Sequence, residues 1–463
     1  VVAENSIAVL PFLNNDGSDE TQTFANGLVD DVITRLSRVP GLSVTSRGDS
    51  FTLTPNSPSE RVRQRLEVAM YLEGSVEMRD EQIRIIVQLI DSHSGFHIQS
   101  RTFDRPRQDF FEIRDEITEL TVSSLRASLP NLAQDMPLTE AEDPGLDVYL
   151  VYRRGIDELY KPRTMETTAA AIAWFNAAID MDPEFAAAHA GRCEALVWQY
   201  VSANDARLIE EGEAACTTAL ELSPNLDVVH VAIGELYRHK GRFLEAANAN
   251  RDALRINPNN VAALLGLAEA QRLLGDTDAA AATLDGAIGL QPGNWRPYLE
   301  LGALMFRRGR VNDAAAQYFK VIAIDDSSMR GYTNLGASYM LAGRFQEALP
   351  VYQRAIAIGP DYRTYTGLGL THYYLGDYDQ AVDAMRSAVN LRPNSHGPWM
   401  NLGDVLYVSG RLTEARGAFA KTQQFLRTAL DVNPNEATNL MDLAWSQAML
   451  GDEGLALQTV ARA

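Results

Sequence analysis

The sequence predicts an α+β chain in which a small amino-terminal α/β sandwich domain precedes an all-α solenoid, coiled as a right-handed superhelix. Three observations support this. A 34-residue period runs through most of the chain after residue 145. Strand-like and helix-like segments mix only in the first 130 residues. The length of 463 residues is too great for one ordinary core. We therefore expect a domain over 1–130, a linker over 131–144 and a solenoid over 145–463.

The first domain opens with a strand, a helix and a second strand. Ser6 to Phe12 is a short apolar run, and Leu42 to Ser46 is another. Between them, Phe24 to Leu36 places its apolar side chains on one helical face. This order predicts a β-α-β unit.

The rest of the domain predicts an antiparallel meander between two helices. A short helix is expected near Pro58 to Leu66, and an amphipathic helix with Ile113, Ile117 and Leu120 on one face closes the domain. Polar turns separate three strand candidates, which are Val68–Met78, Ile83–Asp91 and Phe96–Phe103. A segment containing proline and acidic residues, from Pro130 to Pro144, then predicts the linker.

Several motifs of this domain resemble a known family. They are Ser6-Ile7-Ala8-Val9-Leu10-Pro11-Phe12, Phe24-Ala25-Asn26-Gly27-Leu28, Pro40-Gly41-Leu42-Ser43-Val44, Tyr71-Leu72-Glu73-Gly74-Ser75-Val76 and Gln88-Leu89-Ile90-Asp91. They are similar to the TolB-like amino-terminal domain found ahead of repeat arrays in bacterial regulators. The resemblance implies a sensory or scaffolding module. In that group a CadC-type DNA-binding domain or a class III nucleotide cyclase stands upstream, and the family supplies no catalytic residues.

The solenoid is predicted from small residues that recur at one spacing. Glycine recurs every 34 residues and alanine repeats the same step five residues later, at Gly241, Gly275, Gly309 and Gly343 and at Ala246, Ala280, Ala314 and Ala348. Proline ends most units, as at Pro224, Pro258 and Pro292. The full pattern, from Tyr332 through Gly336, Ala348 and Tyr352 to Pro360, resembles the tetratricopeptide (TPR) repeat.

The pattern has a packing explanation. Small residues such as Gly336 and Ala348 let two helices approach closely, whereas large ones such as Tyr332 and Tyr352 fill the space between neighbours. Counted from Gly145, the chain holds eight complete units and a truncated ninth. Extra residues are expected in the first, second and eighth units, around 161–164, 201–208 and 422–426.

Composition limits the classes of partner. A net charge of −20 argues against nucleic acid contact by this fragment and against anionic membrane surfaces, because both require a basic footprint. No window is apolar enough over about 20 residues to span a bilayer. The chain begins at Val1 without methionine, so we expect a fragment that reaches a membrane only through a missing amino-terminal segment.

The two cysteines, Cys193 and Cys216, fall on inward-facing positions of one helical hairpin. A disulfide between them is sterically conceivable, but two buried thiols are the favoured interpretation. Their spacing does not suit a metal site.

No motif for catalysis or for a cofactor is found. The sequence lacks a phosphate-binding loop, a Gly-x-Ser-x-Gly elbow and a His-Glu-x-x-His pair. His189 and His230 occupy the large-residue position of their repeats, which favours a packing role over metal ligation. We expect the adjacent carboxylates Asp30 and Asp31 to lie on a solvated helix face. The fragment is therefore predicted to be non-enzymatic, with no cofactor or metal.

The concave side of the solenoid remains as a candidate site. The first helix of each hairpin lines that side, and one position in each such helix should face a groove. The predicted peptide-binding residues are Arg238, Arg272, Phe306, Met340, Tyr373, Met400, Tyr407, Met441 and Trp445. A basic section followed by an aromatic and methionine section would suit a peptide with acidic and apolar residues. Packing of these side chains against adjacent helices is an equally weighted alternative.

These observations lead to a functional prediction with two alternatives. We expect a protein- or peptide-binding scaffold, the sensory or interaction part of a bacterial membrane-associated regulator, and a homodimer is a further candidate assembly. The alternatives are the regulatory region of a class III nucleotide cyclase and a free-standing periplasmic assembly factor. The periplasm is the expected compartment, with the cytoplasm as the alternative.

Overall fold

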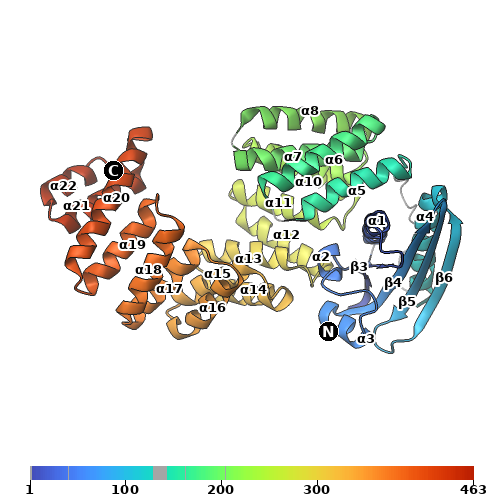
Figure 1. The fold of residues 1–463 in the computed structure, drawn as a ribbon, viewed down its shortest axis with the longest axis horizontal. Coiled ribbons are helices and arrows are strands. Elements are labelled where there is room, and N and C mark those ends of the chain that lie inside the picture. Colours follow the sequence, from blue (N-terminus) through green and yellow to red (C-terminus); the bar gives the residue numbers. More distant parts are fainter. Residues whose placement is uncertain (1–2, 40, 129–142, 162, 204) are drawn as a thin grey trace. The chain divides into compact units, whose positions relative to one another are not determined.

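The computed structural model describes residues 3–39, 41–128, 143–161, 163–203 and 205–463 (Figure 1). The chain forms two compact units, Val1–Pro297 and Tyr298–Ala463, which are described separately below. The first unit contains the α/β domain and the earlier helical hairpins, and the second contains the later hairpins. Most of the predicted linker, 131–144, lies outside the described residues.

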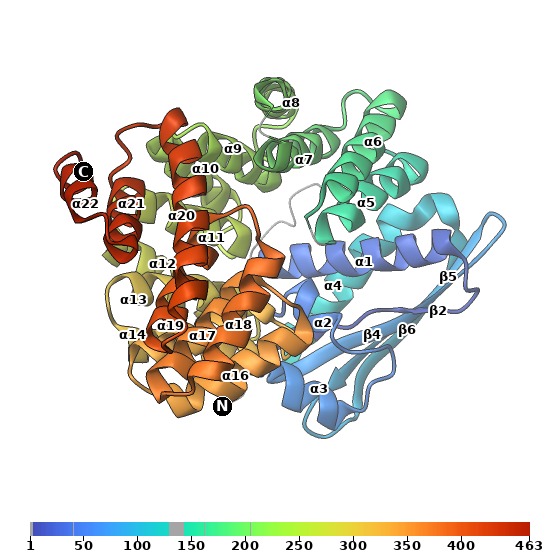
Figure 2. The same cartoon turned by 60° about the vertical axis from the view of Figure 1, so that its left-hand side comes forward.

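The α/β domain is built on one mixed sheet with the strand order β3-β1-β4-β5-β6, and β2 pairs with β4. Figure 2 shows β4, β5 and β6 of this sheet. Strand β1 runs parallel to β3 and β4, whereas β4, β5 and β6 form the predicted antiparallel meander. The strands are β1 (Ala3–Val9), β2 (Leu13–Asn14), β3 (Ser43–Val44), β4 (Val68–Arg79), β5 (Gln82–Asp91) and β6 (His97–Pro106).

Alternating side chains of the strands fill two hydrophobic clusters, one on each face of the sheet. Ile7 and Leu72 point to the face covered by α1 (Asp19–Ser37) and α4 (Phe110–Ser128). Ala8 and Tyr71 point to the opposite face, where α3 (Ser59–Leu66) packs. The predicted β-α-β start and meander are thus confirmed, whereas the two-residue β2 and the one-turn α2 (Arg47–Ser50) were missed because they are too short to show a period.

From Leu146 onward the described chain consists of helices that follow one another as antiparallel pairs (Figure 1). The pairs of the first unit begin with α5 (Leu146–Tyr160) and α6 (Met165–Met181), α7 (Ala186–Ala203) and α8 (Ala206–Leu222), α9 (Asp227–His239) and α10 (Phe243–Ile256), and α11 (Val261–Leu273) and α12 (Thr277–Leu290). Helix α13 (Trp295–Arg307) crosses the division between the units.

The second unit continues the same arrangement with α14 (Val311–Ile324), α15 (Met329–Leu341) and α16 (Phe345–Ile358), α17 (Tyr362–Leu375) and α18 (Tyr378–Leu391), α19 (His396–Val408) and α20 (Leu412–Val432), and α21 (Ala437–Leu450) and α22 (Glu453–Val460). The predicted fold class, an α/β domain followed by a helical solenoid, is confirmed. The extra residues expected around 422–426 lengthen α20 rather than forming a loop.

One contact recurs within the hairpins. A glycine on the first helix lies against a large side chain sixteen residues later on the second helix, as for Gly302 with Tyr318, Gly336 with Tyr352 and Gly403 with Phe419. A Cβ atom built on Gly336 would lie 2.8 Å from the Tyr352 ring. Tyr352 also lies against Gly367 of the next repeat, so a single ring sets the spacing of three helices.

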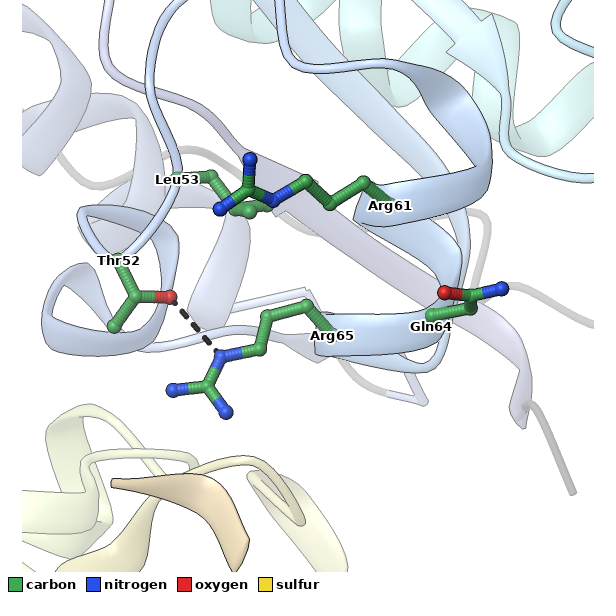
Figure 3. A pocket seen from close by; sticks show the side chains of 5 residues that line it. All are labelled: Thr52, Leu53, Arg61, Gln64 and Arg65. Carbon is green, nitrogen blue, oxygen red and sulfur yellow. Dashed lines mark hydrogen bonds between the residues drawn. The ribbon is translucent and has the colours of Figure 1, made fainter. Parts of the chain in front are cut away.

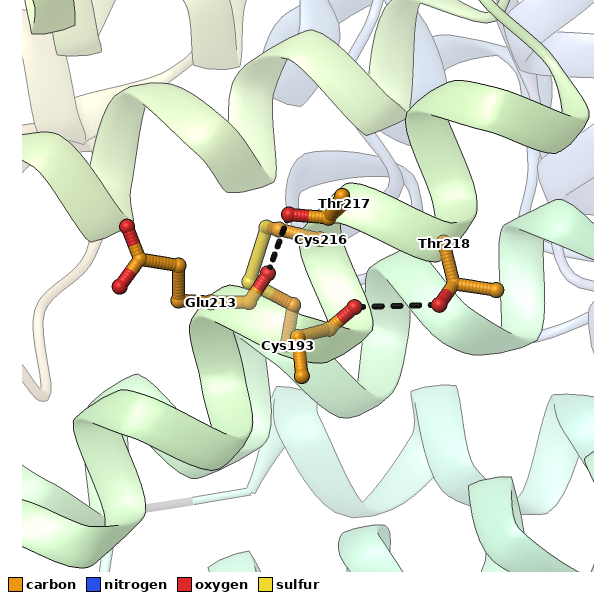
Figure 4. The surroundings of a disulfide bond; sticks show 6 residues. Cys193, Glu213, Cys216, Thr217 and Thr218 are labelled. Atoms are coloured by element: carbon orange, nitrogen blue, oxygen red, sulfur yellow. Dashed lines mark hydrogen bonds between the residues drawn. A yellow bond between two sulfur atoms is a disulfide. The ribbon is translucent and has the colours of Figure 1, made fainter.

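In the second hairpin a cysteine pair replaces this contact. Cys193 stands at the glycine position of α7, Cys216 stands at the large-residue position of α8, and a disulfide joins them (Figure 4). Their Cα atoms are 5.4 Å apart, which is within the normal range for a disulfide. The favoured prediction of two free thiols was therefore wrong, because the pair occupies the point of closest helix approach.

The α/β domain packs directly against the start of the solenoid. Gly27 of α1 leaves room for Tyr149 of α5, whose hydroxyl would lie 2.7 Å from a Cβ atom at residue 27. Leu146, Tyr149 and Leu150 belong to the same hydrophobic cluster as α1 and α4. The cluster therefore continues from the sheet into the first hairpin without a break.

The prediction that Asp30 and Asp31 lie on a solvated face was wrong for Asp30. This carboxylate is only 7% exposed and pairs with Arg153 of α5 and with Arg47, whose Nε lies 2.8 Å from Asp30 Oδ1. Asp31 is half-buried, with Oδ2 located 3.4 Å from Arg114 Nη1. The face was mispredicted because α5 covers it, and α5 is far away in sequence.

A second contact joins α1 to later hairpins. Arg38, which follows α1, lies 3.3 Å from Asp227 at the start of α9. Asn257 and Asn260 donate to the other oxygen of Asp227, at 2.8 and 2.9 Å. The buried Asp227 carboxylate thus links the α/β domain to the third and fourth hairpins.

The glycine contact predicts the effect of adding one methyl group. Gly336→Ala should destabilise the second unit by about 1–3 kcal/mol, because the new Cβ overlaps the buried Tyr352 ring. Gly417→Ala in α20 is the matched control, since no atom lies within 4 Å of its Cβ and alanine should stabilise that helix by about 0.5–1 kcal/mol. Chemical denaturation measures both variants, and equal midpoints would contradict the packing account.

The disulfide predicts a redox-dependent stability. Its cysteines are 23 residues apart in sequence, so the bond should stabilise the first unit by about 3 kcal/mol through the entropy of the unfolded chain. A reductant should lower the melting temperature of the parent and leave a Cys193→Ala/Cys216→Ala variant unchanged. A parent that melts identically with and without reductant, and whose thiols titrate fully when unfolded, would show that the bond does not form.

Candidate peptide-binding surfaces

All nine predicted groove residues lie on first helices of hairpins, and none of them is buried. Arg238 on α9 and Arg272 on α11 belong to the first unit. The second unit holds Phe306 on α13, Met340 on α15, Tyr373 on α17, Met400 and Tyr407 on α19, and Met441 and Trp445 on α21. Their role in binding stays a prediction, and the two sets are treated as two surfaces.

In the first unit the arginines are paired rather than forming a basic patch. Arg238 lies 2.6 Å from Glu235, and Arg272 lies 2.6 Å from Glu269, in each case one helical turn apart. Sequence reasoning overlooked the two glutamates, although Glu235 and Glu269 share the 34-residue spacing of the arginines. The surface therefore presents a row of internally neutralised ion pairs.

Glu235 accepts hydrogen bonds from both Arg238 and His239. Burial opposes its charge, but hydrogen bonds from His239 and Arg238 outweigh the burial and lower its pKa to about 2.

Glu194 occupies the matching position of α7 and has no ion pair closer than 4 Å among the described residues. Burial and the charge of Glu235 raise its pKa to about 7, against the opposing effect of Arg163 and Arg296. The Arg163 guanidinium stacks at 3.4 Å on Trp198. Glu194 is thus a carboxyl group that titrates near neutral pH.

The second unit presents an apolar surface. Tyr407, Met441 and Trp445 are 49%, 50% and 51% exposed. Tyr373 is different, because it packs against the hydrophobic cluster formed by α18, α19 and α20. Trp445 donates from Nε1 to Asp404 Oδ1 at 2.9 Å, which fixes the indole across the neighbouring hairpin.

The histidines at large-residue positions have a structural role, as predicted. The Nε2 atoms of His189 and His230 lie 2.9 and 2.7 Å from the carbonyl oxygens of Pro183 and Pro224, six residues earlier. Trp399 makes the same contact through Nε1 to Pro393 at 2.7 Å. Because a carbonyl oxygen only accepts, the Nε2 atom of each histidine must carry a proton and donate.

An open cavity of about 250 Å³ in the α/β domain is lined by Thr52, Leu53, Arg61, Gln64 and Arg65 (Figure 3). Arg65 Nε lies 3.5 Å from the Thr52 hydroxyl. The lining thus presents a hydroxyl, an amide and two guanidinium groups.

Within the described ranges, no group of three or more histidine, cysteine, aspartate or glutamate side chains is placed to hold a metal ion. In the same part of the chain, no helix has the length and hydropathy of a membrane span.

The pKa of Glu194 predicts a pH-dependent stability. A glutamate of ordinary pKa 4.5 that titrates at about 7 when folded binds its proton more tightly in the folded state. Its contribution to stability is therefore present below pH 4.5 and is lost as pH rises to 7. Glu194→Gln should stabilise the first unit at pH 8 by about 1–2 kcal/mol, after allowance for partial exposure, and change little at pH 4.5. Parallel denaturation curves at the two pH values test this, and an equal shift at both would contradict it.

Comparisons with known proteins agree with the two-part organisation. Residues 3–120 match the family model described as HilA/YgeH-like transcriptional regulator, second domain. Residues 231–294, 274–331 and 366–425 match one tetratricopeptide repeat model, and residues 327–394 match another. The predicted TPR repeats are thereby confirmed, whereas the resemblance of the first domain to the TolB-like group stays a prediction.

Among curated proteins, the Rhizobium meliloti (strain 1021) protein named "Putative adenylate cyclase 3" is 36% identical over 191 residues. The match covers 41% of this chain and 32% of the relative, so the chain spans about a third of that protein's length.

Two solved structures are also similar. A crystal structure of MamA is 28% identical with a TM-score of 0.33, covering 35% of this chain and 95% of that one. The Cut9 and Hcn1 hetero-tetramer of APC/C is 17% identical with a TM-score of 0.48, covering 73% of this chain and 63% of that one. The chain therefore carries tetratricopeptide repeats behind a domain similar to the second domain of HilA/YgeH-like regulators.

Proposed function

We propose that this chain is a non-catalytic scaffold that binds a protein or peptide and serves as the sensory or interaction part of a bacterial membrane-associated regulator. The observation that carries the proposal is the accessible apolar surface of the second unit. Tyr407, Met441 and Trp445 expose about half of their area on first helices, and soluble proteins keep such area chiefly where another molecule docks.

The regulatory part of the proposal has separate support. The match of residues 3–120 is to a domain of transcriptional regulators, and in the proposed role this domain would transmit a signal from the repeats. The relative named as a cyclase favours the second candidate, the regulatory region of a class III nucleotide cyclase. In both candidates this chain binds the partner protein or peptide, and another domain produces the regulatory or catalytic response.

We also propose the periplasm as the compartment. The Cys193–Cys216 disulfide favours an oxidising environment, because such bonds rarely persist in a reducing cytosol. A free-standing periplasmic assembly factor would share this chemistry.

The proposal predicts that two neighbouring tyrosines behave differently. Against peptides selected on the purified chain from a random display library, Tyr407→Ala should weaken binding by about 2 kcal/mol with little change in melting temperature, because the ring is half exposed. Tyr373→Ala should also lower stability by about 2 kcal/mol, because part of its ring packs in the core.

Phe319→Ala is the control for this comparison. Phe319 is 55% exposed on the second helix α14, so its loss should change neither quantity. If Tyr407→Ala binds every selected peptide as the parent does, the second unit is not the binding surface.

A further inference from the structure

One end of the second unit combines apolar area with negative charge. We call this region, which consists of six residues of α19 and α21, the acidic-aromatic surface. The residues are Met400, Asp404, Tyr407, Met441, Asp442 and Trp445. The hydrogen bond from Trp445 to Asp404 joins the two helices across this surface. Its identification as a binding surface rests on the proposed function.

Among the described residues, the carboxylates of this surface have no lysine or arginine partner. Asp404 Oδ1 accepts from Trp445, and among the described residues Asp404 makes no ion pair. Asp442 Oδ2 lies 3.5 Å from the His396 ring, which is its one such contact there. Neither α19 nor α21 contains a lysine or an arginine. Burial raises the pKa of both carboxyl groups, in agreement with weak compensation of their charge.

These features restrict the chemistry of an occupant. A purely apolar peptide would remove the two carboxylates from water without pairing them, which is unfavourable. A guanidinium or ammonium group could pair with Asp404 and Asp442 while it lies against the aromatic rings of Trp445 and Tyr407. Its methylene stem and the adjacent apolar residues would cover Met400 and Met441, whose side chains adapt readily to different shapes.

We propose that the acidic-aromatic surface binds an apolar peptide segment through the side chain of one lysine or arginine. This assigns to the second unit a partner of opposite charge to the one that the sequence predicted from Arg238 and Arg272. Those two arginines are already paired with Glu235 and Glu269, whereas no lysine or arginine among the described residues pairs with either aspartate.

The test uses the full chain and peptides selected on it from a random display library. The selected peptides should be enriched in lysine or arginine next to apolar residues. Replacing the basic residue by glutamine in a synthetic copy should weaken binding about tenfold, and Asp404→Asn should do the same for the unchanged peptide. Asparagine keeps an oxygen to accept from Trp445, so the fold should be retained.

Asp383→Asn is the matched control, because it removes the same charge from the exposed side of α18 and should leave the affinity unchanged. Asp442→Asn provides a second variant if Asp404→Asn does not fold. Selected peptides that need Tyr407 but carry no basic residue, or that bind both asparagine variants as they bind the parent, overturn the proposal and leave the peptide-binding function intact.

Other occupants give different results. Peptides enriched in acidic residues would overturn the proposal, as would concentration-dependent dimerisation abolished by Tyr407→Ala, which would assign the surface to a second copy of the chain. Failure to select any peptide that depends on Tyr407 would instead reject the proposed function of the second unit itself.

Discussion

The architecture of the solenoid depends on the close contact between a small residue of the first helix and a larger side chain of the second helix, as between Gly336 and Tyr352. Tyr352 lies against Gly336 of its own hairpin and against Gly367 of the next, so one side chain sets the distance within a repeat and between repeats. Because packed interiors do not deform continuously, this contact also fixes which side chains of the first helices remain accessible. The exposure of Tyr407 and Trp445 is thus a consequence of buried packing on the other side of their helices.

The α/β domain acts as the amino-terminal cap of this solenoid. A terminal repeat must cover its open hydrophobic side, and here Tyr149 and Leu150 of α5 complete the core of the α/β domain. Asp30 and Arg153 form a buried ion pair at the same junction, which is favourable only if both partners stay in place. The α/β domain and the first hairpins consequently share one compact unit, although they differ in secondary structure and in sequence pattern.

What the sequence could predict follows from the range of the interactions involved. The repeats are built from contacts between residues about 16 to 34 positions apart, and these contacts recur along the chain. The periodicity of the sequence therefore predicts that Gly336 and Tyr352 are packing positions. The pairing of Asp30 with Arg153 spans 123 residues and occurs once, so no pattern reveals it. The ion pairs of Glu235 and Glu269 could have been predicted from the sequence, because a glutamate three residues before each arginine repeats with the same period. The disulfide could not be chosen over two thiols, since only the position of Cys216 opposite Cys193 decides between them.

The two candidate surfaces differ in how far their charged side chains are already paired within the protein. This difference determines which charge on a partner each surface can select. A partner that approaches Arg238 or Arg272 must compete with a glutamate one turn away, so the net gain from a new ion pair there is small. A partner that approaches Asp404 meets a carboxylate that is partly removed from water and has no ion pair within the described part of the chain, so the pair formed is new and poorly screened. Because each repeat contacts mainly its neighbours, this contrast is local to the helices concerned. We therefore expect α19 and α21, rather than α9 and α11, to select a partner by its charge.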